Sequence, residues 1–278
     1  MKVEEHVTIR KILEFQKIIN DYYREHGRSY PWRQTDDPYK ILISEIMLQQ
    51  TQIERVQKKY PIFIHTFPDF KTLAAASLRK ILMIWQGMGY NRRALSLQKI
   101  AKRITSEFNG QVPSSESVLH TFPGIGKTTA SAIAAFAFQR PTIFIETNIR
   151  RTYIHFFFSK QKNVKDSDIL LIVKKTFDAT NPRIWYYALM DYGSILRKNH
   201  PNPNRNSAHY RIQPPFKGSD RQIRGMILKM LLAKQVLTLS RLILKTNQNP
   251  ARMRRILSRL LKEGFIRKHN NGFSLVDK

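Results

Sequence analysis

Two helical patterns joined by a tight glycine turn constrain this chain more than any other feature. The turn is Pro123-Gly124-Ile125-Gly126. Before it, Ser114 or Ser115 can cap a short helix through Leu119. After it, Thr128–Phe138 is small, apolar and free of helix breakers, which predicts a buried helix. Glycine permits positive φ and lets another backbone approach closely. Lys127 and the open N–H groups at the start of the second helix predict an anion seat that can hold a phosphodiester without reading sequence.

Gly126-Lys127-Thr128 also spells the end of a nucleotide-binding phosphate loop. That motif needs a glycine at position 121, where this chain has threonine, and no strand pattern leads into the turn. The phosphate loop is therefore the weaker interpretation, and a plain helix corner without a ligand is the other alternative.

The charge of the chain predicts a polyanionic partner. The 278 residues carry 48 lysines and arginines against 20 acidic residues, a formal net charge of +28. A membrane surface is the rival partner, but no apolar run approaches the roughly 18 residues that a span needs, and the first ten residues lack a signal-peptide core. We expect a cytoplasmic, DNA-associated monomer with no membrane partner.

The chain contains no cysteine. This excludes disulfides, thiolate zinc sites and iron–sulfur clusters. No metal site or cofactor is predicted, apart from a monovalent cation that the glycine turn could hold.

Helical periodicity covers most of the first 198 residues, which predicts one all-α domain over 1–198. The other helical patterns span Thr8–His26, Tyr39–Val56, Phe70–Trp85, Arg92–Thr105, Ile149–Phe158, Asp166–Asp178 and Arg183–Arg197. Residues 199–215 are rich in proline and asparagine, show no period and predict a linker.

Two acidic residues have contrasting sequence environments. Glu45 lies on or beside the apolar stripe of its helix, so we expect it to be protonated or paired; a solvent-facing glutamate is the alternative. Glu146 precedes a helix that Thr147 or Asn148 can cap, with two arginines one turn on, which favours an ionised carboxylate. The alternative for Glu146 is a surface acid that only compensates the helix dipole.

Two segments carry side chains suited to nucleic acid. Gln49 and Gln50 follow Glu45, and glutamine amides suit base edges, although such residues on helices are usually just exposed. Tyr90 stands in a glycine-flanked loop directly before arginines, which suits stacking or wedging, with a buried tyrosine corner as the alternative.

Residues 216–278 predict a small winged-helix domain, three helices followed by a hairpin. The helices are expected over Ser219–Leu232, Thr238–Thr246 and Pro250–Glu263, and the hairpin turns at Asn270-Asn271-Gly272. From Arg197 onward the chain has 19 lysines and arginines against 3 acids, a net +16. Phosphate contact is the expected use, and a protein-binding role is the alternative. The candidate contacts are Arg252, Arg254, Arg255, Arg259, Arg267 and Lys268.

From about Val7 to Ile195 the chain resembles the helix-hairpin-helix (HhH-GPD) DNA glycosylases, and within them the MutY branch. The run Ser44-Glu45-Ile46-Met47-Leu48-Gln49-Gln50-Thr51 is specific to that branch, whereas Pro123-Gly124-Ile125-Gly126 is common to the superfamily. The remaining motifs are Pro31-Trp32-Arg33, Asp37-Pro38-Tyr39, Gly87-Met88-Gly89-Tyr90, Asn148 and Met190-Asp191-Tyr192-Gly193.

The resemblance implies a two-lobed helical fold, double-stranded DNA in the cleft between lobes, and a mispaired base flipped out of the stack. It implies that Glu45 is the general acid toward adenine and that Glu146 stands at the position of the family's catalytic aspartate. Gln49, Gln50 and Tyr90 would fill the gap in the duplex. The implied base-pocket or DNA contacts also include Trp32, Arg33, Pro123, Gly124, Gly126, Lys127, Thr128 and Asn148.

Four departures from the family pattern qualify this expectation. Position 146 is glutamate instead of aspartate, the four cluster cysteines after Gly193 are absent, and a winged helix replaces the domain that senses oxidised guanine. Thr128 stands where lyase members have lysine, which predicts a monofunctional enzyme, although Lys127 is adjacent.

The expected activity is release of adenine opposite guanine or 8-oxoguanine. Release of uracil or thymine mispaired with guanine, and a DNA-binding protein without catalysis, are the alternatives.

Overall fold

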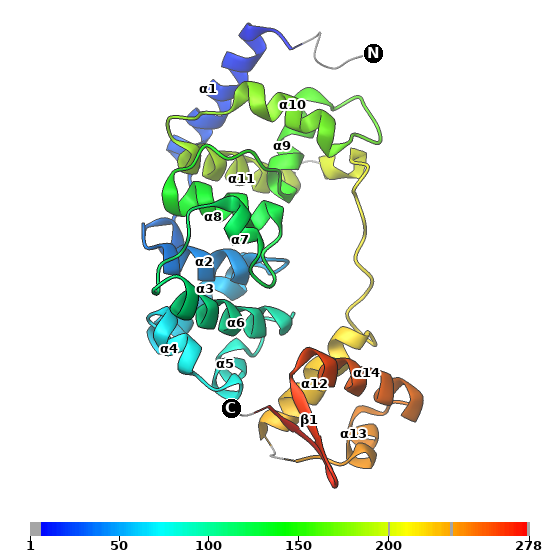
Figure 1. Ribbon diagram of the computed structural model, residues 1–278. Helices are drawn as coiled ribbons and strands as arrows, with labels where there is room; N and C mark the ends of the chain where they lie inside the picture. Colours follow the sequence, from blue (N-terminus) through cyan, green and yellow to red (C-terminus); the bar gives the residue numbers. More distant parts are fainter. Residues whose placement is uncertain (1–6, 200, 234–235, 277–278) are drawn as a thin grey trace. The chain divides into compact units, whose positions relative to one another are not determined.

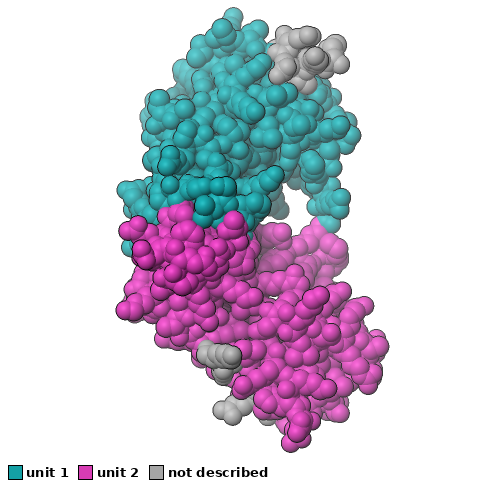
Figure 2. Space-filling model, in the orientation of Figure 1, with its two compact units in different colours: residues 1–41, 114–120, 125–212 teal, residues 42–113, 121–124, 213–278 magenta. Residues whose placement is uncertain are grey.

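The computed structural model describes residues 7–199, 201–233 and 236–276 (Figure 1). Residues 1–6, part of the segment in which the sequence shows no signal-peptide core, lie outside the described residues. The chain forms two compact units, residues 1–41, 114–120 and 125–212, and residues 42–113, 121–124 and 213–278 (Figure 2).

Unit 1 is helical and closes around an aromatic core. Its elements are α1 (Ile9–His26), η2 (Pro31–Arg33), the first turn of α2 (Pro38–Leu48), α7 (Glu116–His120), α8 (Lys127–Phe138), α9 (Thr147–Phe157), α10 (Asp166–Thr176), α11 (Pro182–Asn199) and η3 (Pro203–Asn206). Helix α11 packs along α9 and α1. Phe15, Tyr153 and Trp185 lie at the centre of the core, each 2% exposed or less. Burying such side chains supplies most of the stabilisation of a helical layer of this size.

Unit 2 combines a second helical layer with the C-terminal region. Its elements are the rest of α2, α3 (Ile53–Thr66), α4 (Phe70–Ala75), α5 (Leu78–Trp85), α6 (Arg92–Glu107), α12 (Asp220–Ala233), α13 (Leu239–Thr246), α14 (Pro250–Glu263), β1 (Ile266–His269) and β2 (Gly272–Leu275). Helix α4 packs on α6, and α12 packs on α5. Strands β1 and β2 pair antiparallel from Ile266–Leu275 to His269–Gly272, so Asn270 and Asn271 form the turn. Three helices and a hairpin therefore follow in the predicted order.

The predicted fold class, mostly helical with a small C-terminal hairpin, is confirmed. Two predicted helices are each divided. The Tyr39–Val56 pattern breaks where Gln50 takes a left-handed φ of 52°, and the Phe70–Trp85 pattern breaks before Ser77, which caps α5. Apolar residues recur at helical spacing across both breaks, because each of the helices on either side buries an apolar face. No helix among the described residues is long and apolar enough to cross a membrane.

The segment that the sequence predicts as a linker, residues 199–215, contains a short helical turn in its first part. Residues 203–206 form η3, and Asn204 is 5% exposed. The asparagines that suggested a linker are used as hydrogen-bonding groups: Asn204 Nδ2 donates to the carbonyl of Thr147 at 2.9 Å, and Asn202 Oδ1 accepts from Arg151 Nε at 3.1 Å. This segment belongs to unit 1.

Candidate functional site

Glu45 is the half-buried acid of a helix that is otherwise withdrawn from solvent. Residues 41–44 and 46–47 of α2 are each at most 1% exposed, and the only other charged residue of the helix is Lys40 in its first turn. The apolar surroundings predicted from the sequence are therefore present.

Glu146 is the N-cap of α9. Its Oε1 accepts from the backbone N–H groups of Asn148 at 2.6 Å and Ile149 at 2.8 Å, and its Oε2 accepts from Asn148 Nδ2 at 3.3 Å. The prediction that Thr147 or Asn148 caps this helix is therefore wrong, because a glutamate one position earlier reaches the same N–H groups. The carboxylate is held in one orientation by the start of the helix.

Burial dominates the titration of Glu146 and raises the pKa of its carboxyl group, while the two backbone N–H groups and then the arginines lower it by less. The expectation that helix start and arginines alone fix the charge is thus corrected. The reason lies in the partners of the arginines. Arg150 pairs with Asp166 through two 2.7 Å bonds. Arg151 donates to Asn148 Oδ1 at 2.7 Å and to the carbonyl of Gly193 at 2.6 Å, so neither guanidinium bonds to Glu146.

The start of α9 is fixed by a close helix crossing. A Cβ on Gly193 of α11 would lie 2.2 Å from the carbonyl oxygen of Asn148, so only glycine allows this approach. Asn204 of η3 and Arg151 hold the same turn from two further sides. Asn148 therefore positions Glu146 and closes the crossing, a structural role that its motif alone did not reveal.

A buried arginine organises the two loops that carry the predicted gap-filling residues. Arg93 Nη1 donates to the carbonyls of Ile46, Met47 and Gln49 at 3.0, 2.7 and 2.6 Å. Its Nη2 donates to Thr51 Oγ1 at 2.8 Å and to the carbonyls of Met88 and Gly89 at 3.2 Å each. The sequence suggested only that an arginine after Tyr90 suits DNA. Its fork instead joins the end of α2 to the Tyr90 loop.

These two loops present three side chains in different ways. Gln50 is exposed, and Gln49 is half-buried with its Nε2 donating to the carbonyl of Gly124 at 3.1 Å. Tyr90 has a left-handed φ of 45° and is 36% exposed, so a buried tyrosine corner is excluded. Its hydroxyl contacts Gln213 Nε2 and accepts from Arg221 Nη1 at 3.1 Å. Tyr90 is thus held by residues that lead into the C-terminal region.

The glycine turn has the backbone geometry that the sequence predicted. Gly124 takes a φ of 83°, and a Cβ there would lie 2.9 Å from Ser96 Oγ. Gly126 is the N-cap of α8 and offers no side chain to its N–H groups. Lys127 and Thr128 are exposed beside it. The helix start is therefore uncapped by side chains and flanked by a cation, which suits an anion.

Two predicted contacts with the base or DNA are buried within unit 1. Trp32 is 4% exposed and stacks on Tyr30 with ring centroids 4.9 Å apart. Arg33 donates to both carboxylate oxygens of buried Asp191 at 2.9 Å, and Arg28 bonds to the same carboxylate. This ion-pair cluster holds the loop after α1, which is a structural role for Arg33 that the sequence did not predict.

Three arginines of α14 gather around one acid. Asp220 accepts from Arg252 at 2.8 Å and from Arg255 at 3.3 Å, and lies 3.7 Å from Arg259. Arg254 and Lys268 are exposed, while Arg267 donates to Ser274 Oγ at 3.2 Å. The positive surface of the C-terminal region is thus present, partly balanced by Asp220.

No cluster of three or more potential metal ligands occurs among the described residues, and the sequence has no cysteine. The four-thiolate cluster that the resemblance implies cannot be built from these residues. The segment in its place, η3, is held to α9 by the asparagine contacts described above.

Comparisons with known proteins agree on one family. Residues 43–174 match the HhH-GPD superfamily base excision DNA repair protein family. The chain is 30% identical over 272 residues to an adenine DNA glycosylase of Mycolicibacterium smegmatis, covering 90% of this chain and 92% of the relative. It is 36% identical over 195 residues to an adenine DNA glycosylase of Buchnera aphidicola, covering 68% of this chain but only 55% of that relative.

Solved structures share the fold. A thermostable thymine-DNA glycosylase is 26% identical, with a TM-score of 0.62 over 67% of this chain and 87% of that chain. A trapped endonuclease III–DNA covalent intermediate aligns with a TM-score of 0.58 at 18% identity, over 68% of this chain and 87% of that chain, and supports the fold alone.

Proposed function

Because the chain belongs to the adenine DNA glycosylase family of the HhH-GPD superfamily, we propose that it is a base excision repair enzyme that releases mispaired adenine from duplex DNA. The observation that carries the proposal is Glu45, a half-buried acid among fully buried apolar residues within the family's most specific motif. The uncapped start of α8 behind the glycine turn supplies the seat for the DNA backbone.

The reaction breaks the bond between C1′ of deoxyribose and N9 of adenine. The leaving base gains electron density and the sugar becomes positive, so a proton donor at the base and a carboxylate near the sugar lower the barrier. We assign proton donation to Glu45, the half-buried acid among the buried residues of α2. Water then attacks C1′, which leaves free adenine and an abasic site.

Glu146 is proposed as the carboxylate that stabilises the positive sugar. Its orientation supports this role, because two backbone N–H groups bind one oxygen and leave the other bonded only weakly, at 3.3 Å. It must be ionised to act, and its pKa is raised by burial. The extra methylene relative to aspartate is accommodated because the side chain folds back to cap its own helix.

The test is base release from a panel of mispairs under single-turnover conditions, followed by alkali cleavage. We expect release of adenine opposite guanine or 8-oxoguanine. Glu45→Gln should lose about 10²- to 10⁴-fold of the rate, the usual contribution of general acid catalysis. Glu54→Gln, an exposed acid of α3 in the same unit, is the matched control. A native rate in Glu45→Gln with unchanged DNA binding would contradict the assignment.

Release of thymine or uracil opposite guanine is the second candidate, favoured by the thymine-DNA glycosylase among the structural neighbours. The same panel distinguishes it. Borohydride added to the panel reports on lyase chemistry. With threonine at position 128 we expect no trapped protein–DNA adduct, and an adduct that Lys127→Gln abolishes would assign Lys127 as the amine. An enzyme that binds every duplex but releases no base would support a non-catalytic DNA-binding protein.

A further inference from the structure

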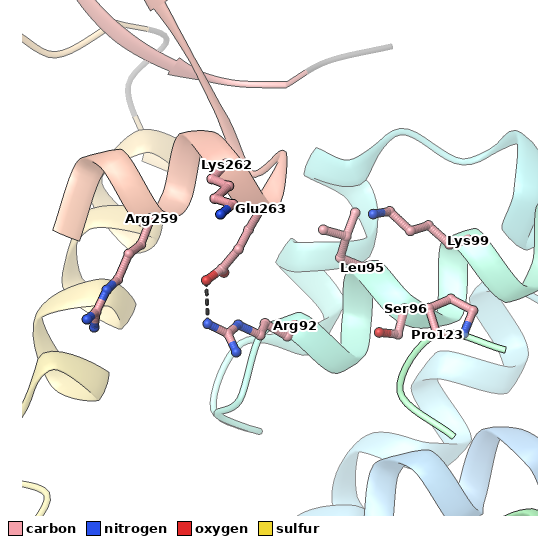
Figure 3. Close-up of a pocket in the computed structure, with 8 residues that line it drawn as sticks. All are labelled: Arg92, Leu95, Ser96, Lys99, Pro123, Arg259, Lys262 and Glu263. Carbon is pink, nitrogen blue, oxygen red and sulfur yellow. Dashed lines mark hydrogen bonds and ion pairs between the residues drawn. The ribbon is translucent and has the colours of Figure 1, made fainter. Parts of the chain in front are cut away.

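A basic pocket lies in unit 2 between α6 and α14, beside the glycine turn. Its volume is about 560 Å³. Figure 3 shows the lining residues of α14 facing those of α6, with Pro123 of the turn beside Ser96. The lining residues are Arg92, Leu95, Ser96, Lys99, Pro123, Arg259, Lys262 and Glu263.

The charge of this pocket is strongly positive. Four of its residues are cations, and Glu263 is its only acid. That acid is already neutralised, because it pairs with Arg92 at 2.5 Å and with Arg224 from the other side. Lys99 and Lys262 are exposed, and neither makes a hydrogen bond or ion pair within the described ranges. Two uncompensated ammonium groups therefore border one cavity.

The pocket is continuous with the turn that the proposed function places on the DNA backbone. Pro123 belongs to both, and Ser96 of the pocket lies against Gly124, within 2.9 Å of where a Cβ would stand. Like-charged side chains brought together beside such a turn are electrostatically unfavourable unless an anion joins them.

We propose that this pocket binds the phosphodiester backbone of duplex DNA next to the glycine turn, with Lys99 and Lys262 as its phosphate contacts. The C-terminal region would then bind DNA through the end of α14, together with α6. The Asp220 ion-pair cluster of Arg252 and Arg255 adjoins the pocket through Arg259, which lines the pocket and lies 3.7 Å from Asp220. The inference rests on the proposed function only in taking DNA as the ligand.

The test is the salt dependence of DNA binding by Lys99→Gln/Lys262→Gln in the full-length chain. Each phosphate contact contributes about 0.9 to the slope of log K against log salt, so the double variant should lose about 1.8. Between 50 and 200 mM salt the wild-type affinity should consequently fall about 12-fold more than that of the variant. The loss should be equal for mispaired and fully paired duplexes, because the contact is to the backbone.

Two further double variants make the result decisive. Lys174→Gln/Lys175→Gln removes two exposed lysines of α10 and should leave the slope unchanged. Arg267→Gln/Lys268→Gln removes the hairpin charges. The proposal would be overturned if the salt slope falls in the hairpin variant but stays at the wild-type value in Lys99→Gln/Lys262→Gln. It would also be overturned if the salt slope falls equally in the pocket variant and in the α10 control.

Excision separates this proposal from the proposed function. At subsaturating enzyme the pocket variant should release base more slowly than the wild type, because it binds DNA less tightly, whereas Lys174→Gln/Lys175→Gln should release it at the wild-type rate. If neither the wild type nor any variant releases base, the proposed enzymatic function is contradicted, but the result on DNA binding still stands. A thermal unfolding midpoint equal to that of the wild type confirms that the pocket variant is folded.

Discussion

Arg93 provides the sharpest test of how the DNA-facing loops are built. We expect Arg93→Met to destabilise the protein and to disorder the positions of Gln49 and Tyr90 together. Burial lowers the pKa of Arg93 to about 10, so the side chain is still cationic at neutral pH. It donates to six acceptors, and those at Ile46, Met47 and Met88 are fully buried.

The magnitude follows from those three acceptors. A buried carbonyl left without a donor costs about 1–3 kcal/mol. Near the lower end of that range, the three together give about 3–4 kcal/mol of lost unfolding free energy. The cation also sits at the C-terminal end of α2, where a positive charge is favourable by a further few tenths to about 2 kcal/mol. Arg93→Lys keeps the charge but cannot span both loops, so it should recover only a minor part of the loss.

Urea unfolding and DNA binding together decide the question. Arg55→Met, an exposed arginine of α3, is the control and should change stability by less than about 0.5 kcal/mol. Arg93→Met should lose stability and specific mispair binding while keeping the salt slope. If it instead unfolds at the wild-type urea concentration and its salt slope drops by about 0.9, Arg93 is a phosphate contact and the structural argument fails.

Three further predictions concern other parts of the site. Asp191→Asn should cost about 3–5 kcal/mol in urea unfolding, because it leaves Arg28 and Arg33 without their buried acid. Burial alone would raise the pKa of Asp191, but the two arginines lower it on balance, so the stabilisation holds above the unfolded value near 3.9 and is lost on acidification below it. A flat stability profile from pH 5 to pH 2 would argue against this pair. As pH falls, the excision rate should begin to drop above the ordinary glutamate pKa of 4.5, because burial raises the pKa of Glu146 and protonation removes its charge. Rate–pH profiles of the wild type and Glu146→Gln measure this. A rate that drops only near the ordinary glutamate pKa would count against the role of Glu146. Gln213→Ala should leave the Tyr90 hydroxyl bonded to Arg221 and change mispair binding less than Tyr90→Ala does. Tyr90→Ala should weaken mispair binding more than binding to paired duplex. Anisotropy on both duplexes measures this, and equal losses in Tyr90→Ala would remove Tyr90 from the gap-filling role.

The sequence predicted most of the helices, since apolar periodicity is a local signal. Helices α1 and α14 begin at Ile9 and Pro250, within one residue of the predicted starts, and the turn geometry at Gly124 matches the motif. What it could not predict were long-range partners. Arg93 contacts carbonyls more than 40 positions away, and backbone carbonyls leave no mark in a sequence. The ion-pair cluster at Asp191 likewise joins segments about 160 residues apart.

Ambiguity in single residue types explains the other errors. From the sequence, Glu146 is an acid beside arginines at a helix start. In the structure its side chain caps the helix and is buried, and burial outweighs the arginines in setting its pKa. The sequence placed Gln49 and Gln50 on the surface of a continuous helix, whereas Gln50 takes a left-handed conformation just after α2 ends. In both cases the residue type fits two local conformations, and only the surrounding packing selects one.

The asparagine-rich segment shows how this chain holds the proposed catalytic helix start without cluster cysteines. The start of α9 must be fixed, because it orients Glu146 through its N–H groups. Asn204 binds the carbonyl of Thr147, and Asn202 binds Arg151, which in turn bonds to Asn148 and to the carbonyl of Gly193. Three segments thereby meet at one helical turn: the start of α9, α11 at Gly193, and residues 202–204. Short, neutral amides can supply this linkage at little desolvation cost, since each is both donor and acceptor. The same residues that give the segment its linker-like composition therefore position the carboxylate.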